Sequence, residues 1–290
     1  MINTTETENI CGLKRSDFQT TVGGKETDLY ILKNNQGNEV AITNYGGALV
    51  AIMVPDKNGN RANVIQGHDN IQDVINSPEP YLSTLVGRYG NRICKGRFQL
   101  HGKEYQLPIN NGPNCLHGGL KGFNAKVWEA LQMNEHTLVL KYVSPYGEEG
   151  FSGEMKVTVE YSFTDDNELV IEYMATTNKK TVVNLTSHGF FSLAGIANPT
   201  PSIENLECEI NADYYLPIDE TSRDSFWAGV RVLAGMTRKC PLNRLIRSIR
   251  VIRVQTLSLA ALHTEGAEDG SEDGDDEIDY FLNCFLFHFY

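Results

Sequence analysis

The segment MKVTVEYSF at residues 155–163 alternates strictly between apolar and polar side chains. The apolar members share one face and the polar members share the other, which is the pattern of a strand that covers a core on one side. A polar five-residue loop, TDDNE, follows, and LVIEYMA at 169–175 is again rich in β-branched and apolar residues. The two runs predict an antiparallel β-hairpin, so β-sheet is expected to dominate the surrounding chain.

Similar strand and turn signals extend outward from this hairpin. HTLVLKYV at 136–143 and NEVAIT at 38–43 predict further strands, and PDKNGN at 55–60 predicts a turn whose Asn-Gly pair supplies positive φ. No window of 12 residues before residue 222 carries a helical period. Many short strands separated by Gly, Asn and Pro predict an all-β fold, a large antiparallel β-sandwich or barrel. The 290 residues are enough for one large β domain or two ordinary ones.

Composition narrows the classes of function. The chain has 37 Asp or Glu against 25 Lys or Arg, a net charge of −12, which argues against nucleic acid as a partner of the whole chain. No apolar run reaches the length of about 18 residues that a membrane span requires. The N-terminus lacks the apolar core of a signal peptide, and the six cysteines form no CxxC pair. These features predict free thiols in a reducing compartment, and therefore a cytoplasmic protein.

The charge balance changes sharply near residue 222. Residues 1–222 hold 17 Lys or Arg and 27 acidic residues, a net of −10, whereas 223–262 hold eight basic residues and one acidic residue, a net of +7. Segment 265–279 then carries nine acidic residues and no basic one. We therefore expect a β domain at 1–222 and a divergent tail at 223–290, basic and then acidic. A separate domain, an added or disordered tail and a shifted reading frame all fit this change.

The tail carries two further patterns. LNRLIRSIRVI at 242–252 spaces its apolar residues as a helix would, with arginines between them, which is typical of a basic amphipathic helix and also arises by chance in an out-of-frame sequence. IDYFLNCFLFHFY at 278–290 is too short to span a bilayer and, if exposed, favours aggregation. Nothing in 223–290 alternates over enough length to replace several strands. We expect these residues not to complete a binding cleft.

A polar strand face is predicted in VVNLTSHGFF at 182–191. Alternation places Asn184, Thr186 and His188 on one face, and Phe190 and Phe191 end the run. Amides and imidazoles bind hydroxyl groups and aromatic rings cover C–H faces, so this face suits a sugar. The competing interpretation is a solvated outer face with one incidental histidine.

Three glycine-rich loops are candidates for close approach of the backbone to a neighbour: GRYGNRI (87–93), GPNCLHGGLKGFNAKVW (112–128) and GEEGFSGE (147–154). None matches a phosphate-binding loop. The histidines match no zinc-binding spacing, so we expect no metal. Cys94 and Cys115 are more consistent with packing than with a nucleophile.

Seven motifs occur together in a characteristic order. The chain resembles the aldose 1-epimerase (galactose mutarotase) family over about residues 20–222. The resemblance implies a large antiparallel β-sandwich with a sugar cleft on its concave face and no cofactor. The motifs that carry it are NYGGALVAIMVPDKNGN (44–60), TLVGRYGNRI (84–93), NNGPNCLHGG (110–119), GFNAKVW (122–128), GEEGFSGEMKVTVEYSF (147–163), NLTSHGFFSLAG (184–195) and INADYYLPIDE (210–220).

The resemblance also implies a role for individual residues. His188, in NLTSHGFF, matches the family's general acid, which protonates the sugar ring oxygen. His117, in the LHGG loop, matches a second catalytic histidine that hydrogen-bonds the sugar near the reacting centre. Asn91 and Arg92, in GNRI, match the pair that binds sugar hydroxyls. These four residues are expected to line one concave pocket.

One part of the family pattern is missing. The family's base is a glutamate in a C-terminal motif resembling E-x-Q-x-x-P-D, which this chain lacks, and an upstream sugar-binding aspartate is matched to no residue. The leading hypothesis is an aldose 1-epimerase that interconverts the α and β anomers of a free hexose. The alternatives are a sugar-binding protein without catalysis and an epimerase of hexose 6-phosphate, in which Arg88, Arg92 and Arg97 meet the phosphate.

Overall fold

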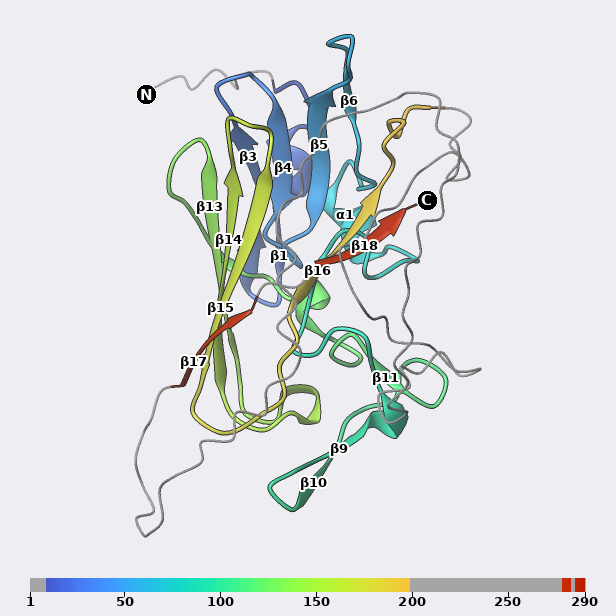
Figure 1. Cartoon of the computed structure of the whole chain (residues 1–290), viewed down its shortest axis with the longest axis vertical. Helices are drawn as coiled ribbons and strands as arrows, with labels where there is room; N and C mark the ends of the chain where they lie inside the picture. The colour runs from blue at the N-terminus through green and yellow to red at the C-terminus, as the bar shows by residue number, and fades with distance from the viewer. Residues whose placement is uncertain (1–8, 199–277, 283–284, 290) are drawn as a thin grey trace, which may run out of the picture.

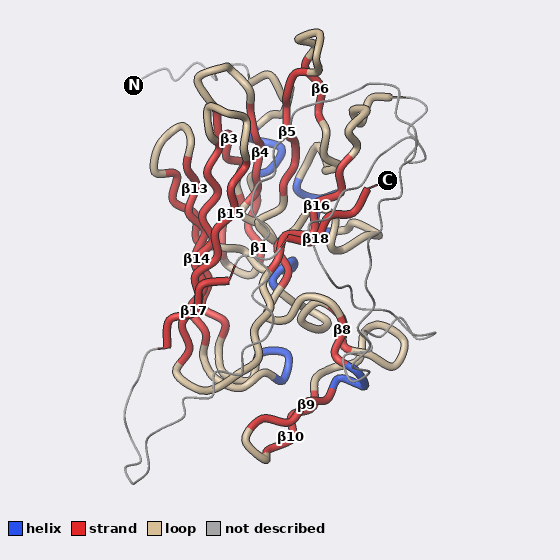
Figure 2. The backbone as a smooth tube through the Cα atoms, viewed as in Figure 1, coloured by secondary structure: helices blue, strands red, loops and turns tan. Residues whose placement is uncertain are grey.

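Strands dominate the part of the chain that the structure describes. The computed structural model describes residues 9–198, 278–282 and 285–289. Its single α-helix there, α1 (Ile71–Ile75), is five residues long, and Figure 2 shows how little of the trace is helical. Four short 3₁₀ turns accompany it: η1 (Arg15–Phe18), η2 (Cys94–Gly96), η3 (Phe123–Ala125) and η4 (Glu148–Gly150). The expected all-β fold, a large antiparallel β-sandwich, is therefore confirmed.

The predicted hairpin lies at the centre of a five-stranded sheet, in the order β12-β13-β14-β15-β17 (Figure 1). In β14, Met155, Val157 and Val159 are buried while the residues between them are exposed or half-buried. The register pairs Met155 with Thr177 and Phe163 with Leu169, which closes the hairpin around the TDDNE loop. The strands of this five-stranded sheet are β12 (Glu129–Gln132), β13 (Thr137–Ser144), β14 (Met155–Phe163), β15 (Leu169–Thr177) and β17 (Ile278–Leu282).

A four-stranded antiparallel sheet of order β3-β4-β5-β6 forms the second large layer (Figure 1). Every residue of its inner strand β4 is buried. The predicted turn at 55–60 joins β5 to β6, where the Asp56 side chain accepts hydrogen bonds from the N–H groups of Asn58 (2.8 Å) and Asn60 (2.9 Å). The strands are β3 (Leu29–Lys33), β4 (Glu39–Thr43), β5 (Leu49–Pro55) and β6 (Arg61–Asn63).

The two large sheets share one hydrophobic core. Side chains of the four-stranded sheet, such as Ile42 and Ile52, belong to the same buried cluster as Val159 and Tyr173 of the five-stranded sheet. The Tyr161 hydroxyl is buried inside this cluster and donates a hydrogen bond of 2.8 Å to the carbonyl of Gly47, 114 residues away. Burial of one face of each strand is what the alternating pattern requires, because hydrophobic stabilisation follows the apolar area removed from water.

A smaller three-stranded sheet, of order β18-β16-β7, carries the polar segment that contains His188. The strands are β7 (Leu85–Val86), β16 (Thr186–Phe191) and β18 (Phe285–Phe289). The strand starts at Thr186 instead of residue 182, and all six of its residues are buried. The interpretation of this segment as a solvated outer face is therefore wrong: neighbouring strands and loops cover both of its sides.

The end of the chain contributes two strands that were not expected there. β17 pairs with β15 in the antiparallel direction, with Tyr173 opposite Leu282 at one end and Thr177 opposite Ile278 at the other. β18 pairs with β16 in the parallel direction. Nothing in 223–290 was expected to replace several strands, and the described residues of that segment supply two strands of five residues each. Both segments are rich in aromatic residues, and an open sheet edge offers unpaired N–H and C=O groups to such segments. The predicted helix at 242–252 and the acidic run up to residue 277 lie outside the described residues.

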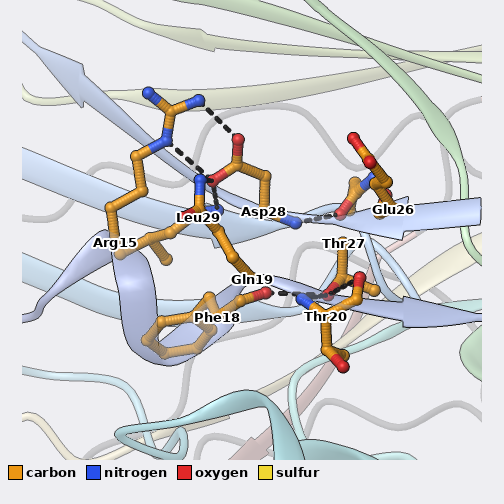
Figure 3. Close-up of polar contacts among 9 residues, drawn as sticks. Arg15, Phe18, Gln19, Thr20, Glu26, Thr27, Asp28 and Leu29 are labelled. Carbon is orange, nitrogen blue, oxygen red and sulfur yellow. Dashed lines mark hydrogen bonds and ion pairs between the residues drawn. The ribbon is translucent and has the colours of Figure 1, made fainter.

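Three two-stranded ladders complete the fold: β1 (Thr20–Val22) with β2 (Lys25–Thr27), β8 (Arg92–Ile93) with β11 (Cys115–Leu116), and β9 (Arg97–Leu100) with β10 (Lys103–Gln106). Figure 3 shows polar contacts that attach the turn η1 to the first ladder and to Asp28, which follows it. Arg15 pairs with the Asp28 carboxylate, and the Thr27 hydroxyl donates to the Phe18 carbonyl at 2.7 Å. The second ladder carries the loops of the candidate site.

Candidate active site

His188 lies in the middle of β16 and is held by two backbone hydrogen bonds to the neighbouring segment 83–84. Its N–H donates to the carbonyl of Thr84 at 2.8 Å, and its carbonyl accepts from the N–H of Ser83 at 3.1 Å. The side chain is buried and its ring stacks on that of Phe190, with centroids 5.0 Å apart and an interplanar angle of 27°. Residues two apart on a strand share a face, so the strand itself places the aromatic ring beside the imidazole.

His117 follows β11 directly and meets Asn91, which directly precedes β8. The His117 N–H donates to the Asn91 carbonyl at 3.1 Å, as the next pair of the β8-β11 ladder would. The Asn91 N–H donates instead to His117 Nδ1 at 3.0 Å. That bond needs a lone pair on Nδ1, so a neutral ring carries its proton on Nε2. The backbone therefore presents His117 as a hydrogen-bond donor through Nε2.

The structure brings the two histidines together, although 71 residues separate them in the sequence. Their ring centroids are 5.0 Å apart at an interplanar angle of 87°, and both side chains are buried. The imidazoles lie on one side of β16, in edge-to-face contact. Two rings that can each donate or accept a proton therefore face the same small region.

Tyr81 is a third member of this group and was not anticipated from the sequence. Its ring centroid is 4.7 Å from that of His117 and 6.1 Å from that of His188. Burial is the main cause that raises the pKa of its hydroxyl to about 12, so the group stays protonated near neutral pH. The sequence signal that could have indicated Tyr81 is its position in the segment SPEPYLST (77–84), shortly before the GRYGNRI loop.

Asn91 and Arg92 lie at the same site. The Arg92 Nη1 donates to the Asn91 side-chain oxygen at 3.2 Å, and its Nε donates to that of Asn111 at 3.0 Å. These two contacts use two of the five N–H donors of a guanidinium. Together with His117 and His188, all four sequence-predicted site residues are thus in one neighbourhood.

The glycine-rich loops do approach one another closely. An ideal β-carbon on Gly118 would lie 1.9 Å from the carbonyl oxygen of Gly87, so the LHGG loop packs directly on the backbone of the GRYGNRI loop. The GEEGFSGE loop reaches the same place, where the Glu149 carboxylate accepts from the Leu120 N–H at 2.6 Å. Close approach of three loops is what the glycines allow.

Arg88 is not placed to contact a phosphate group. Only 2% of its surface is exposed, and its guanidinium donates to the Ser144 hydroxyl and to the carbonyls of Ser144, Pro145 and Ser152, at 2.8–2.9 Å. Burial lowers the pKa of this guanidinium to about 10, which still leaves it charged near neutral pH. The residue instead attaches the 144–152 loop to the site. Charge alone did not reveal that this arginine is buried.

A separate groove with a volume of about 790 Å³ lies over the β1-β2 ladder and the start of β12. Its lining includes Glu26, Asp28 and Lys25, but none of the four predicted site residues. Its Asp28 carboxylate is already engaged, because it accepts hydrogen bonds from Arg15 and Gln19 (Figure 3). The histidine site is therefore the better candidate for catalysis.

The described residues offer little to other kinds of chemistry. Among them, no group of three or more His, Cys, Asp or Glu is placed to hold a metal ion. Burial raises the pKa of the Cys115 thiol to about 11, which disfavours the thiolate that a nucleophile requires. None of the described helices has the length and apolarity needed to cross a membrane. The motif at 210–220 lies outside the described residues.

Comparison with known proteins identifies relatives of this chain. A protein-family model described as aldose 1-epimerase matches residues 28–225. Rat galactose mutarotase is 43% identical over 199 residues, which cover 69% of this chain and 56% of that protein. Aldose 1-epimerase of Escherichia coli K12 is 33% identical over 197 residues, which cover 68% and 56%. The match therefore spans little more than half the length of these curated relatives.

Solved structures show the same similarity. A galactose 1-epimerase from Lactobacillus acidophilus superposes with a TM-score of 0.65 at 27% identity, covering 76% of this chain and 64% of that one. An aldose epimerase homologue from C. elegans gives a TM-score of 0.64 at 27% identity, covering 69% and 60%. The β-sandwich described above is thus a fold shared with sugar epimerases.

Proposed function

The chain belongs to the aldose 1-epimerase family, and we propose that it binds a free hexose, such as glucose or galactose, and interconverts its α and β anomers. The observation that carries this proposal is the pair of buried imidazoles, His117 and His188, with ring centroids 5.0 Å apart. Both curated relatives named above carry epimerase or mutarotase names, and both align with the segment that contains the two histidines.

Mutarotation needs proton transfer at two oxygens. The ring hemiacetal opens when an acid protonates the ring oxygen while a base removes the proton of the C1 hydroxyl, and rotation of the C1 carbonyl before closure gives the other anomer. An imidazole with an unperturbed pKa of about 6.5 can supply or remove a proton near neutral pH. The reaction needs no metal, nucleotide or covalent intermediate.

In this proposal His188 is the general acid. Its ring is fixed by the backbone of β16 and by the stacked ring of Phe190, so its ring nitrogens have a defined direction. His117 acts as a hydrogen-bond donor to the sugar, because its Nδ1 already accepts from the Asn91 N–H and its proton lies on Nε2. Arg92 and the Asn91 side chain bind hydroxyl groups beside the two rings.

Sugar binding without turnover is the second candidate. The observation that favours it is the missing E-x-Q-x-x-P-D motif, which supplies the base in the family. Without the glutamate of that motif, ring opening loses one of its two proton transfers, so this second candidate predicts little mutarotase activity. An epimerase of hexose 6-phosphate has less support, because Arg88 is buried and Arg97 pairs with Glu104 and Gln106.

The amino-acid composition supports a proposal for the cellular compartment of the protein and for the kind of partner it binds. We place the protein in a reducing compartment, such as the cytoplasm, with a small sugar and not a nucleic acid as its partner. Two of its cysteines, Cys11 and Cys115, are free thiols in the structure. The net charge of −12 disfavours binding to a polyanion.

Polarimetry on freshly dissolved α-glucose and α-galactose tests the proposal, with calorimetric titration of the same sugars in parallel. Accelerated mutarotation by the 290-residue chain supports the epimerase. Saturable binding without acceleration supports the sugar-binding protein. If the chain shows neither sugar binding nor accelerated mutarotation at millimolar sugar, both candidates are contradicted.

A further inference from the structure

The side chain of Asn110 is the centre of the hydrogen bonds around His117. Its Oδ1 accepts from the N–H of Leu116 at 2.7 Å, and its Nδ2 donates to the carbonyls of Leu116 at 3.0 Å and Gly119 at 2.8 Å. The same Nδ2 also donates to the hydroxyl oxygen of Tyr81 at 3.2 Å, so its two N–H groups are shared among three acceptors. One carboxamide therefore holds the backbone on both sides of His117 and the phenol that lies against its ring.

Asn110 is itself fixed by a tight turn. Its N–H donates to the carbonyl of Asn114 at 3.2 Å. Asn111 and Asn114 form an isolated antiparallel bridge with hydrogen bonds of 3.1 and 2.9 Å. The side chain of Asn110 is half-buried. These contacts keep it in place as an anchor for the loop that follows.

The loop needs such an anchor because of its backbone conformation. His117 has φ of +52° and Asn91, its ladder partner, has φ of +68°. The left-handed region is unfavourable for residues that carry a β-carbon, so surrounding contacts must stabilise it. Without them, His117 would relax toward negative φ and its Nδ1 would move away from the Asn91 N–H.

We infer that Asn110 is a positioning residue, which holds the Nε2–H of His117 and the hydroxyl of Tyr81 in one fixed arrangement toward the sugar. This inference rests on the proposed function and assigns Asn110 no contact with the sugar itself. Because Nδ2 donates to the Tyr81 oxygen, the proton of that hydroxyl points away from Asn110. The site then presents two oriented donors, one imidazole N–H and one phenol O–H.

The carboxamide is the side chain that suits this place. It combines an acceptor for the Leu116 N–H with donors for two carbonyl oxygens on one planar group. An aspartate has the same shape and keeps the acceptor. Its second oxygen would face the carbonyls of Leu116 and Gly119, which it cannot satisfy as a carboxylate.

The test compares Asn110→Asp and the uncharged Asn110→Ser with Asn76→Asp as a matched control. The Asn76 side chain also donates to a main-chain carbonyl, that of Gln72 at 2.8 Å, but it lies at the exposed end of α1. All variants are made in the 290-residue chain and checked by thermal unfolding. The first readout is the ¹⁵N spectrum of the imidazoles, which reports which nitrogen of His117 carries the proton. The second is polarimetry and calorimetric titration with galactose.

Wild type should show His117 as a single tautomer with its proton on Nε2. The Asn110 variants that melt cooperatively should lose this single signature and lower the rate or the affinity by about 10²-fold, the effect of a displacement of about 1 Å. Asn76→Asp should change neither. An unchanged His117 signature in a folded Asn110 variant would overturn the inference. If the wild-type protein neither binds nor converts sugar, only the proposed function is contradicted. The imidazole spectrum still decides whether Asn110 positions His117.

Discussion

Replacing Gly118 by alanine measures how tightly the LHGG loop packs against the GRYGNRI loop. Gly118 has φ of +88°, and an added β-carbon would lie 1.9 Å from the oxygen of Gly87 and 2.8 Å from the backbone nitrogen of Arg88. Gly59, in the β5-β6 turn, has nearly the same φ of +85° but no atom within 4 Å of an added β-carbon. The two substitutions therefore share their backbone penalty and differ only in the contacts that the new methyl group meets.

The expected magnitudes follow from these distances. The left-handed conformation costs an alanine about 1 kcal/mol, so Gly59→Ala should lower the free energy of unfolding by about that amount. In Gly118→Ala the β-carbon must also move away from a rigid carbonyl to at least 3.0 Å, a shift of about 1 Å. Overpacking of this kind adds about 1–3 kcal/mol, so the total should be about 2–4 kcal/mol. His117 moves with the loop, and sugar turnover or affinity should fall by about 10²-fold.

Urea unfolding of wild type and both variants measures the stability difference, and titration with galactose measures the effect on the site. Gly59→Ala should keep wild-type sugar affinity, since that turn lies outside the site. Equal destabilisation by the two substitutions, with affinity unchanged in both, would show that the loops are not in contact at Gly118. The reasoning about how His117 is positioned would then be refuted.

Three further predictions concern the site and its support. His188→Asn should lower the mutarotation rate by about 10²–10⁴-fold with little change in affinity; polarimetry checks this, and retention of more than about a tenth of the rate would remove His188 from the role of acid. Arg88→Met should lower the free energy of unfolding by about 3–5 kcal/mol, because it removes the donor of two buried carbonyls, those of Ser144 and Ser152, and of the Pro145 carbonyl; urea unfolding measures it, and a loss below about 1 kcal/mol would contradict it. The pKa of Tyr81 is about 12 in the folded chain and about 10 when unfolded, so its contribution to stability should be constant below pH 10 and fall between pH 10 and 12; this part of the pH dependence should be absent from Tyr81→Phe.

The strand pattern was predictable where burial is one-sided. In 155–163 every second side chain enters the core, so the sequence period of two maps directly onto the burial of β14. The turn at 55–60 was predictable for a related reason, because its Asp, Asn and Gly act locally. The histidines, Asn91 and Arg92 were named from motif resemblance. Their roles stay predictions, although the structure places them side by side.

Other features depend on contacts that no local pattern records. Segment 182–191 was ambiguous between a solvated and a buried face, and only the folded structure shows that all six residues of β16 are buried within a three-stranded sheet. Arg88 carried the sequence signature of an anion contact, yet its partners lie 56–64 residues away in the chain. Tyr81 reaches Asn110 across 29 residues. The strands of 278–289 likewise took their partners from sheets formed earlier in the chain.

By itself, the sequence determined the fold class and the main hairpin, because side-chain periodicity and turn chemistry act over a few residues and are written directly in residue order. The family followed separately, from the resemblance of its motifs. Tertiary structure alone decided that the two imidazoles meet, that the Asn91 N–H assigns the proton of His117 to Nε2, and that Asn110 joins the loop to Tyr81. The physical reason is the range of the interactions. A hydrogen bond extends about 3 Å in space and is indifferent to separation along the chain, so its partners become known only when the chain has folded.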